Sequence, residues 1–199
     1  MIDFPGAKDH LIDLLQSNLN WRFYYHNTEH ALDVLFATTR LCEFEKITGR
    51  EKTLLETAAL FHDVGIIERL DDHEEHSVRI VHDVLPQFRY TPEDIETVSR
   101  LILATRIDHK PCQIHEQIIC DADLDYLGRD DFFIHSFRLQ LEWRVLGIKK
   151  TTLAEWLTFE LSFLESHRFQ TRSAKMLRDE GKRRIISEIK KISLNLKQP

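Results

Sequence analysis

A histidine and an aspartate, His62 and Asp63, lie side by side inside the apolar stretch Ala58–Gly65. Ionisable side chains are seldom buried among apolar residues without a partner, because loss of solvent disfavours their charged forms. Imidazole nitrogens and carboxylate oxygens are both ligands of divalent metal ions. The pair therefore predicts a metal site.

Two more segments place the same residue types among apolar neighbours. Upstream, His26 and His30 lie in Tyr25–Val34, and downstream, three aspartates lie in Cys120–Gly128. Asn27 and Thr28 are residue types that cap helix N-termini, which predicts His30 in the first turn of a helix and His26 in the preceding loop. A solitary buried histidine usually bonds a carbonyl, but this order of His, His-Asp and Asp favours a shared metal.

The downstream segment offers Asp121, Asp123 and Asp125 as the last ligand. The positions three and four residues from Asp123 are apolar or aromatic: Ile119, Cys120, Tyr126 and Leu127. On a helix this spacing predicts a buried carboxylate, which needs a cation. Asp123 is therefore the predicted ligand; Asp121 is the second choice, or orients a ligand histidine, and Asp125 is expected to be exposed.

These segments, in this order, resemble the motifs of the HD-domain superfamily of metal-dependent phosphohydrolases, named after the adjacent His-Asp pair seen here in Phe61–Gly65. Tyr25–Val34 is also similar to a metal motif of cyclic-nucleotide phosphodiesterases, and Asp121–Gly128 to the last HD motif. Over about residues 20–165 the chain resembles small, stand-alone bacterial HD phosphohydrolases. The resemblance implies four metal ligands: His30, His62, Asp63 and Asp123.

Two imidazoles and two carboxylates form a mixed nitrogen and oxygen site. Such a site suits one divalent transition metal ion, Mn, Fe, Co, Ni or Zn, and is compatible with Mg. A bound ion would activate water and neutralise charge on a phosphoryl oxygen. We therefore expect hydrolysis of a small phosphomonoester or phosphodiester, with a nucleotide as the expected class.

The leaving oxygen of such a reaction needs a proton, and His26 is the candidate general acid. In the phosphodiesterases that Tyr25–Val34 resembles, the equivalent histidine has this role; the alternative is a histidine that packs in a loop. Asp63 is the candidate base. Three further residues are candidates for orienting the site or contacting substrate: Asn27, Arg106 and His109. For Arg106, an ordinary surface arginine is the alternative.

The residues present bear on other functions found within the superfamily. The lysine that follows the His-Asp motif of cyclic-dinucleotide hydrolases is replaced by Ile66, which disfavours that subfamily. A di-iron oxygenase needs additional histidine ligands. His73, His76, His82 and His109 are available for a second metal, and His76 and His109 are the favoured pair. A non-catalytic binding or regulatory module that retains the metal is the remaining alternative.

The apolar residues recur at helical spacing, as in Leu11, Leu14 and Leu15, and we find no convincing strand. Helices are predicted at about 7–19, 28–47, 52–67, 73–85, 92–106, 114–127, 131–146, 152–166 and 170–194. We therefore predict an all-α fold, a single compact HD-domain helical bundle over residues 1–199. Its core spans about 20–165, and the C-terminal helices of 166–199 pack on it or extend from it.

The bulk composition is that of an ordinary globular protein. Of 199 residues, 42% are hydrophobic and 30% charged, and there is no run of 18 apolar residues or secretory signal. An odd number of cysteines, three, favours a cytoplasmic location. A net charge of −6 argues against general nucleic-acid binding. The expected partner is a small phosphorylated substrate, not a membrane, and a homo-oligomer is compatible with the sequence.

The stretch Arg178–Arg184 is locally basic and departs from the acidic average of the chain. It predicts a solvated helical face or, alternatively, a patch that attracts anions.

Overall fold

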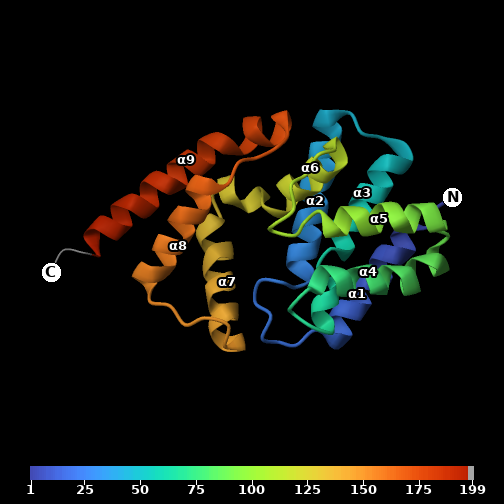
Figure 1. Ribbon diagram of the computed structural model, residues 1–199, viewed down its shortest axis with the longest axis horizontal. Coiled ribbons are helices and arrows are strands. Elements are labelled where there is room, and N and C mark those ends of the chain that lie inside the picture. The colour runs from blue at the N-terminus through green and yellow to red at the C-terminus, as the bar shows by residue number, and fades with distance from the viewer. Residues whose placement is uncertain (197–199) are drawn as a thin grey trace. The chain divides into compact units, whose positions relative to one another are not determined.

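The computed structural model describes residues 1–196, and within them the chain forms nine α-helices, three short 3-10 helices and no strand (Figure 1). The predicted all-α class is confirmed. The chain divides into two compact units. The first comprises Met1–Trp21 and His26–Asp123, and the second comprises Arg22–Tyr25 and the chain from Leu124 onward.

The first unit contains six α-helices and two 3-10 helices. They are α1 (Phe4–Asn18), α2 (Thr28–Glu45), α3 (Gly49–Phe61), η1 (Val64–Ile67), α4 (His73–Val84), η2 (Leu85–Phe88), α5 (Pro92–Leu103) and α6 (Ile114–Asp123). Helix α2 packs on α3 and α6, and α3 packs on α5. The core between them includes fully buried Leu55, Ile102 and Ile118. These contacts bring the ends of α2, α3 and α6 together.

Local sequence explains where several of these helices begin. The Asn27 side chain accepts hydrogen bonds from the backbone N–H groups of Glu29 and His30, at 2.9 and 3.1 Å, and so caps α2. This confirms one of the two predicted N-caps and places His30 in the first turn. At α5, Thr91 and Asp94 form a capping box, and Pro92 occupies the first position of the helix.

Two predicted helices end earlier than expected. The helix predicted over 52–67 stops at Phe61 and continues as η1, and the helix predicted over 114–127 stops at Asp123, ahead of η3 (Asp125–Gly128). Both continuations are also helical in type, so the apolar spacing persists through the break. Periodicity alone therefore does not reveal either boundary.

The break after α3 has a cause in the packing of Gly65. A Cβ atom at this position would lie 2.1 Å from the His73 carbonyl oxygen and 2.5 Å from the Ser77 backbone nitrogen. The Gly65 N–H also donates to the Ser77 hydroxyl at 2.8 Å. The first turn of α4 thus packs directly on the backbone of η1 at Gly65, two residues after Asp63.

The second unit contains η3, α7 (Phe132–Leu146), α8 (Leu153–Ser166) and α9 (Arg172–Asn195). An aromatic cluster links α7 to α8, with the ring centroids of Trp143, Trp156 and Phe159 between 5.2 and 5.4 Å apart. Beneath it the Trp156 N–H donates to the Ser136 hydroxyl, which donates to the buried Glu160 carboxylate at 2.6 Å.

The basic stretch of α9 is mostly engaged inside the second unit. Arg178 pairs with Asp125, which is 3% exposed, and buried Lys182 donates to the His167 carbonyl at the end of α8. The expected solvated face is therefore wrong for these two residues. The expected exposure of Asp125 is also wrong, because α6 ends before it and the periodicity of that helix no longer applies.

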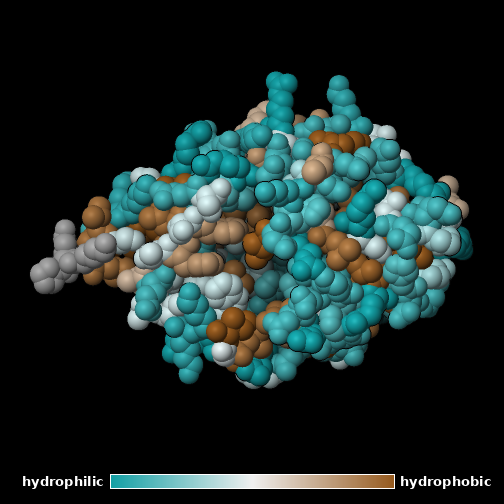
Figure 2. All heavy atoms as spheres, viewed as in Figure 1, coloured by the Kyte–Doolittle hydropathy of each residue, from teal (hydrophilic) through white to brown (hydrophobic). Residues whose placement is uncertain are grey.

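On the face drawn in Figure 2, hydrophilic residues cover much of the surface, with apolar residues reaching it between them. Among residues 1–196, none of the helices combines the length and apolar character that a membrane crossing requires. The single domain expected over residues 1–199 stays a prediction.

Glu160 should make stability depend on pH. Burial raises the pKa of this carboxyl to about 7 from an ordinary value of 4.5, although the Ser136 hydroxyl bond opposes the rise. Between these values the unfolded chain loses the proton and the folded chain keeps it, so unfolding becomes easier as pH rises. We expect the free energy of unfolding to fall by about 3 kcal/mol across this window.

Urea unfolding followed by tryptophan fluorescence from pH 4 to 8 measures this effect. Glu160→Gln should remove the fall, whereas Glu165→Gln, an exposed position on the same helix, should keep it. Equal pH profiles for the wild type and Glu160→Gln would contradict the assignment.

Candidate metal centre

Four of the predicted side chains meet in the first unit. His30 Nε2 lies 3.2 Å from Oδ1 of Asp123 and 3.4 Å from Oδ2 of Asp63. His62 Nε2 lies 3.3 and 3.1 Å from the same two oxygens. One ligand atom each from His30, His62 and Asp123 fall within 4.8 Å of one another, the spacing expected of groups that hold a metal ion. Asp63 borders both imidazoles from its place after α3.

Within the described part of the chain, the neutral His62 ring presents an unpartnered nitrogen to this arrangement. Its Nδ1 lies 2.8 Å from the Ala59 carbonyl oxygen, which can only accept, so Nδ1 carries the proton of the neutral ring. Nε2 then presents a lone pair toward two carboxylates, and this buried atom has no hydrogen-bond partner among residues 1–196. A cation between these atoms would satisfy them all.

The pKa shifts show the same need for positive charge. Burial by itself would lower the pKa of His30 and of His62, but the neighbouring carboxylates outweigh it and raise both. Burial would likewise raise the pKa of Asp63 and Asp123, but His62 and His30 outweigh it and lower both. The cluster therefore keeps its carboxylates ionised and favours positive charge beside them.

His26 lies at the edge of this cluster, in the loop before α2. Its ring centroid is 6.0 Å from that of His30 and 6.1 Å from that of His73. Asn27 follows as the α2 cap, so its side-chain oxygen is engaged by backbone N–H groups. The structure thus brings His26 beside the four predicted ligands and gives Asn27 the role of fixing the turn that carries His30.

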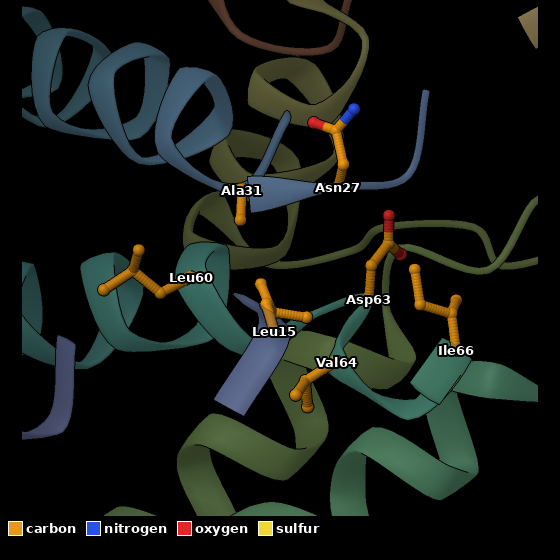
Figure 3. A pocket seen from close by; sticks show the side chains of 7 residues that line it. All are labelled: Leu15, Asn27, Ala31, Leu60, Asp63, Val64 and Ile66. Atoms are coloured by element: carbon orange, nitrogen blue, oxygen red, sulfur yellow. The ribbon is translucent and has the colours of Figure 1, made fainter. Parts of the chain in front are cut away.

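A small hollow opens beside Asp63. Its volume is about 10 Å³, room for roughly one water molecule, and its walls are mostly apolar: Leu15, Ala31, Leu60, Val64 and Ile66. Figure 3 shows the Asp63 carboxylate pointing toward the side where Asn27 lies. The polar groups of the hollow therefore gather at the end next to the candidate metal ligands.

His73, which the sequence offers only as a possible ligand of a second metal, contacts Asp63. Its Nε2 lies 3.2 Å from Oδ1 of Asp63, the oxygen turned away from His30 and His62, and its Nδ1 lies 2.9 Å from the Leu70 carbonyl. Burial lowers the pKa of His73, but the hydrogen bond to Asp63 prevails and raises it to about 9. The sequence feature that could have indicated this contact is Gly65. Because it has no side chain, the first turn of α4 packs closely enough for His73 to reach Asp63.

The remaining candidate residues lie among other partners. Arg106 pairs with Glu75 in the first turn of α4, and His109 lies 3.6 Å from Glu116. His76 lies 2.7 Å from Glu68, so the structure gives His76 and His109 different carboxylate partners.

The order of burial among the aspartates differs from the prediction. Asp121, on α6, is 1% exposed, whereas the Asp123 side chain is 21% exposed. Asp123, the last residue of α6, nevertheless approaches both imidazoles. The carboxylate that meets the histidines is thus not the most buried one, because it faces a shared polar space.

Sequence comparison matches residues 27–125 to the HD domain family. An uncharacterized protein from Clostridium beijerinckii is 33% identical over 105 residues, which cover 51% of this chain. The match spans 65% of that relative's length, just under two thirds.

Solved structures share the fold. A protein described as a predicted HD superfamily hydrolase, from an uncultured Thermotogales bacterium, is 16% identical with a TM-score of 0.65, covering 94% of this chain and 92% of its own. Bacillus subtilis YpgQ, solved in complex with ADP, is 20% identical with a TM-score of 0.68, covering 98% and 97%. With the motif residues converging inside the matched region, the chain is an HD-domain protein, and residues 27–125 are its HD domain.

Proposed function

We propose that this chain is a metal-dependent phosphohydrolase that acts on a small phosphomonoester or phosphodiester. The observation that carries the proposal is the buried meeting of two imidazoles with two carboxylates, with the His62 Nε2 lone pair left to a cation. His30, His62, Asp63 and Asp123 would hold one divalent ion. When bound, such an ion supplies an activated water and neutralises charge on a phosphoryl oxygen.

The chain's own groups have complementary tasks around this ion. His26 donates a proton to the leaving oxygen, since it lies in the loop beside His30 and outside the ligand group. Asp63 accepts a proton from the attacking water through a carboxylate that stays ionised, because the neighbouring imidazoles lower its pKa against the effect of burial. Arg106, held by Glu75 at the start of α4, is the candidate contact for a substrate phosphate.

A nucleotide is the proposed substrate class. The fold is shared with Bacillus subtilis YpgQ, which was solved in complex with ADP. A panel of nucleotides and sugar phosphates, assayed with Mn, Co, Ni and Mg, tests this proposal. Turnover of nucleotides above that of sugar phosphates supports it, and hydrolysis confined to sugar phosphates would contradict the nucleotide class.

Removing the His-Asp pair should remove the metal. We expect His62→Ala with Asp63→Ala to abolish metal uptake and hydrolysis, because two of four ligands are lost, while the far-ultraviolet circular dichroism stays helical. Metal content by mass spectrometry, taken before any chelator treatment, measures the uptake.

The chain provides a matched control for this double variant. His82 and Asp83 form a second adjacent His-Asp pair, exposed on α4, so His82→Ala with Asp83→Ala should retain the metal. Unchanged turnover in the His62 and Asp63 variant would refute the site. A wild-type content of two Fe per chain would instead favour the oxygenase alternative.

His26→Ala should separate catalysis from metal binding. Because His26 lies outside the ligand group, the variant should keep the metal while kcat falls roughly 10²–10⁴-fold, the usual scale for losing acid–base assistance. Added imidazole should restore part of the rate. A wild-type rate in His26→Ala, or a parallel loss of metal, would remove the proposed role.

A further inference from the structure

Two of the junctions between the units lie next to site residues in the sequence. Three peptide bonds join the units: Trp21–Arg22, Tyr25–His26 and Asp123–Leu124. Two of these bonds adjoin site residues, the candidate acid His26 and the candidate ligand Asp123. The second unit therefore holds the residue next to each of them.

We propose that Arg178 positions Asp123 through Asp125. This inference rests on the proposed metal site, because it assigns a role to residues that place one of its ligands. Arg178 itself lies on α9, 55 residues beyond Asp123 in sequence. It is a positioning residue, since it acts through its partner on η3.

The contact between Arg178 and Asp125 fixes orientation as well as distance. Arg178 Nε donates to Oδ1 and Nη2 donates to Oδ2 of Asp125, each at 2.7 Å, so the guanidinium engages both oxygens. Asp125 is 3% exposed, and the Arg178 side chain is 15% exposed. A paired fork of this kind is stronger and more directional than a single ammonium contact.

Direct backbone packing holds the same 3-10 turn. A Cβ atom at Gly181 would lie 2.0 Å from the Gly128 carbonyl oxygen, and one at Gly128 would lie 2.4 Å from the Arg178 carbonyl oxygen. Helix α9 and η3 therefore contact each other through their main chains at Gly128, one end of the turn. At the other end, Arg178 forms the hydrogen-bonded ion pair with Asp125. Only Leu124 separates this fixed turn from Asp123.

The junction before His26 is held in a similar way. The Tyr25 backbone N–H donates at 2.8 Å to Oε2 of Glu142, a fully buried carboxylate on α7. The Tyr25 ring also packs edge-on against Tyr126 and His135, with centroids 5.8 and 6.4 Å apart. The residue before His26 is thus anchored to the same unit as the turn after Asp123.

Arg178→Lys tests the proposal with little disturbance of the fold, because lysine keeps the charge but loses the fork. The Asp123 oxygen lies 3.2 and 3.3 Å from the ring nitrogens of His30 and His62. In metal-free protein at one pH, we expect Arg178→Lys to shift the ring NMR signals of both histidines. We also expect the dissociation constant for Mn²⁺ to rise about tenfold, as when support for a ligand is lost.

Arg184→Lys is the matched control. Arg184 lies on the same helix and pairs with Asp130, close to the same turn, but both partners are exposed. This variant should leave the ring signals and the dissociation constant for Mn²⁺ at their wild-type values. A second variant, Asp125→Asn, keeps the shape and one acceptor oxygen and should reproduce the effects of Arg178→Lys.

The proposal would be overturned if folded Arg178→Lys and Asp125→Asn kept the wild-type ring signals and Mn²⁺ affinity and showed only a lower melting temperature. The pair would then be purely structural. Loss of the folded state in both variants would overturn it too, since the pair would then serve folding. The ring signals are measured without metal, so they test the role of Arg178 independently of metal binding. If the wild type bound no Mn²⁺, that result would refute the proposed function and not the role of Arg178.

Discussion

In the first unit, negative charges and lone pairs are concentrated at one largely buried point, and the arrangement of the helix ends depends on them. Two ionised carboxylates face two imidazoles there, and the Ala59 carbonyl fixes the His62 ring so that its free nitrogen points at those carboxylates. Such an arrangement is costly unless a positive charge lies among the groups, because burial removes much of their solvent. Neighbouring contacts, including that of His73 with Asp63, add partners to the same carboxylates.

The fold meets this requirement by placing the candidate ligands at helix ends. His30 lies in the first turn of α2, His62 is the C-terminal cap of α3, Asp63 starts η1, and Asp123 is the last residue of α6. At a helix end the backbone leaves the helical path, so adjacent residues such as His62 and Asp63 can face one point. The interruption after Phe61 is thus what lets both members of the pair reach the site.

Much of this was predictable from the sequence, for identifiable reasons. Helical spacing located the α-helices, and the capping residue Asn27 fixed the start of α2. The early ends of α3 and α6 were not predictable, since the 3-10 turns that follow keep the apolar spacing. The contact of His73 with Asp63 and the pairing of Asp125 with Arg178 were not predicted, because both depend on tertiary packing, at Gly65 and at Gly128. Local pattern supplied the candidate ligands, and tertiary contacts determined what surrounds them.

Anomalous scattering from manganese, recorded on a crystal of the protein grown with Mn²⁺, would locate the bound metal. We expect one anomalous peak per chain, within coordination distance of Nε2 of His30 and His62 and of carboxylate oxygens of Asp63 and Asp123. A fully loaded crystal with its manganese elsewhere, or with His62 Nε2 bonded to a protein group instead, would contradict it.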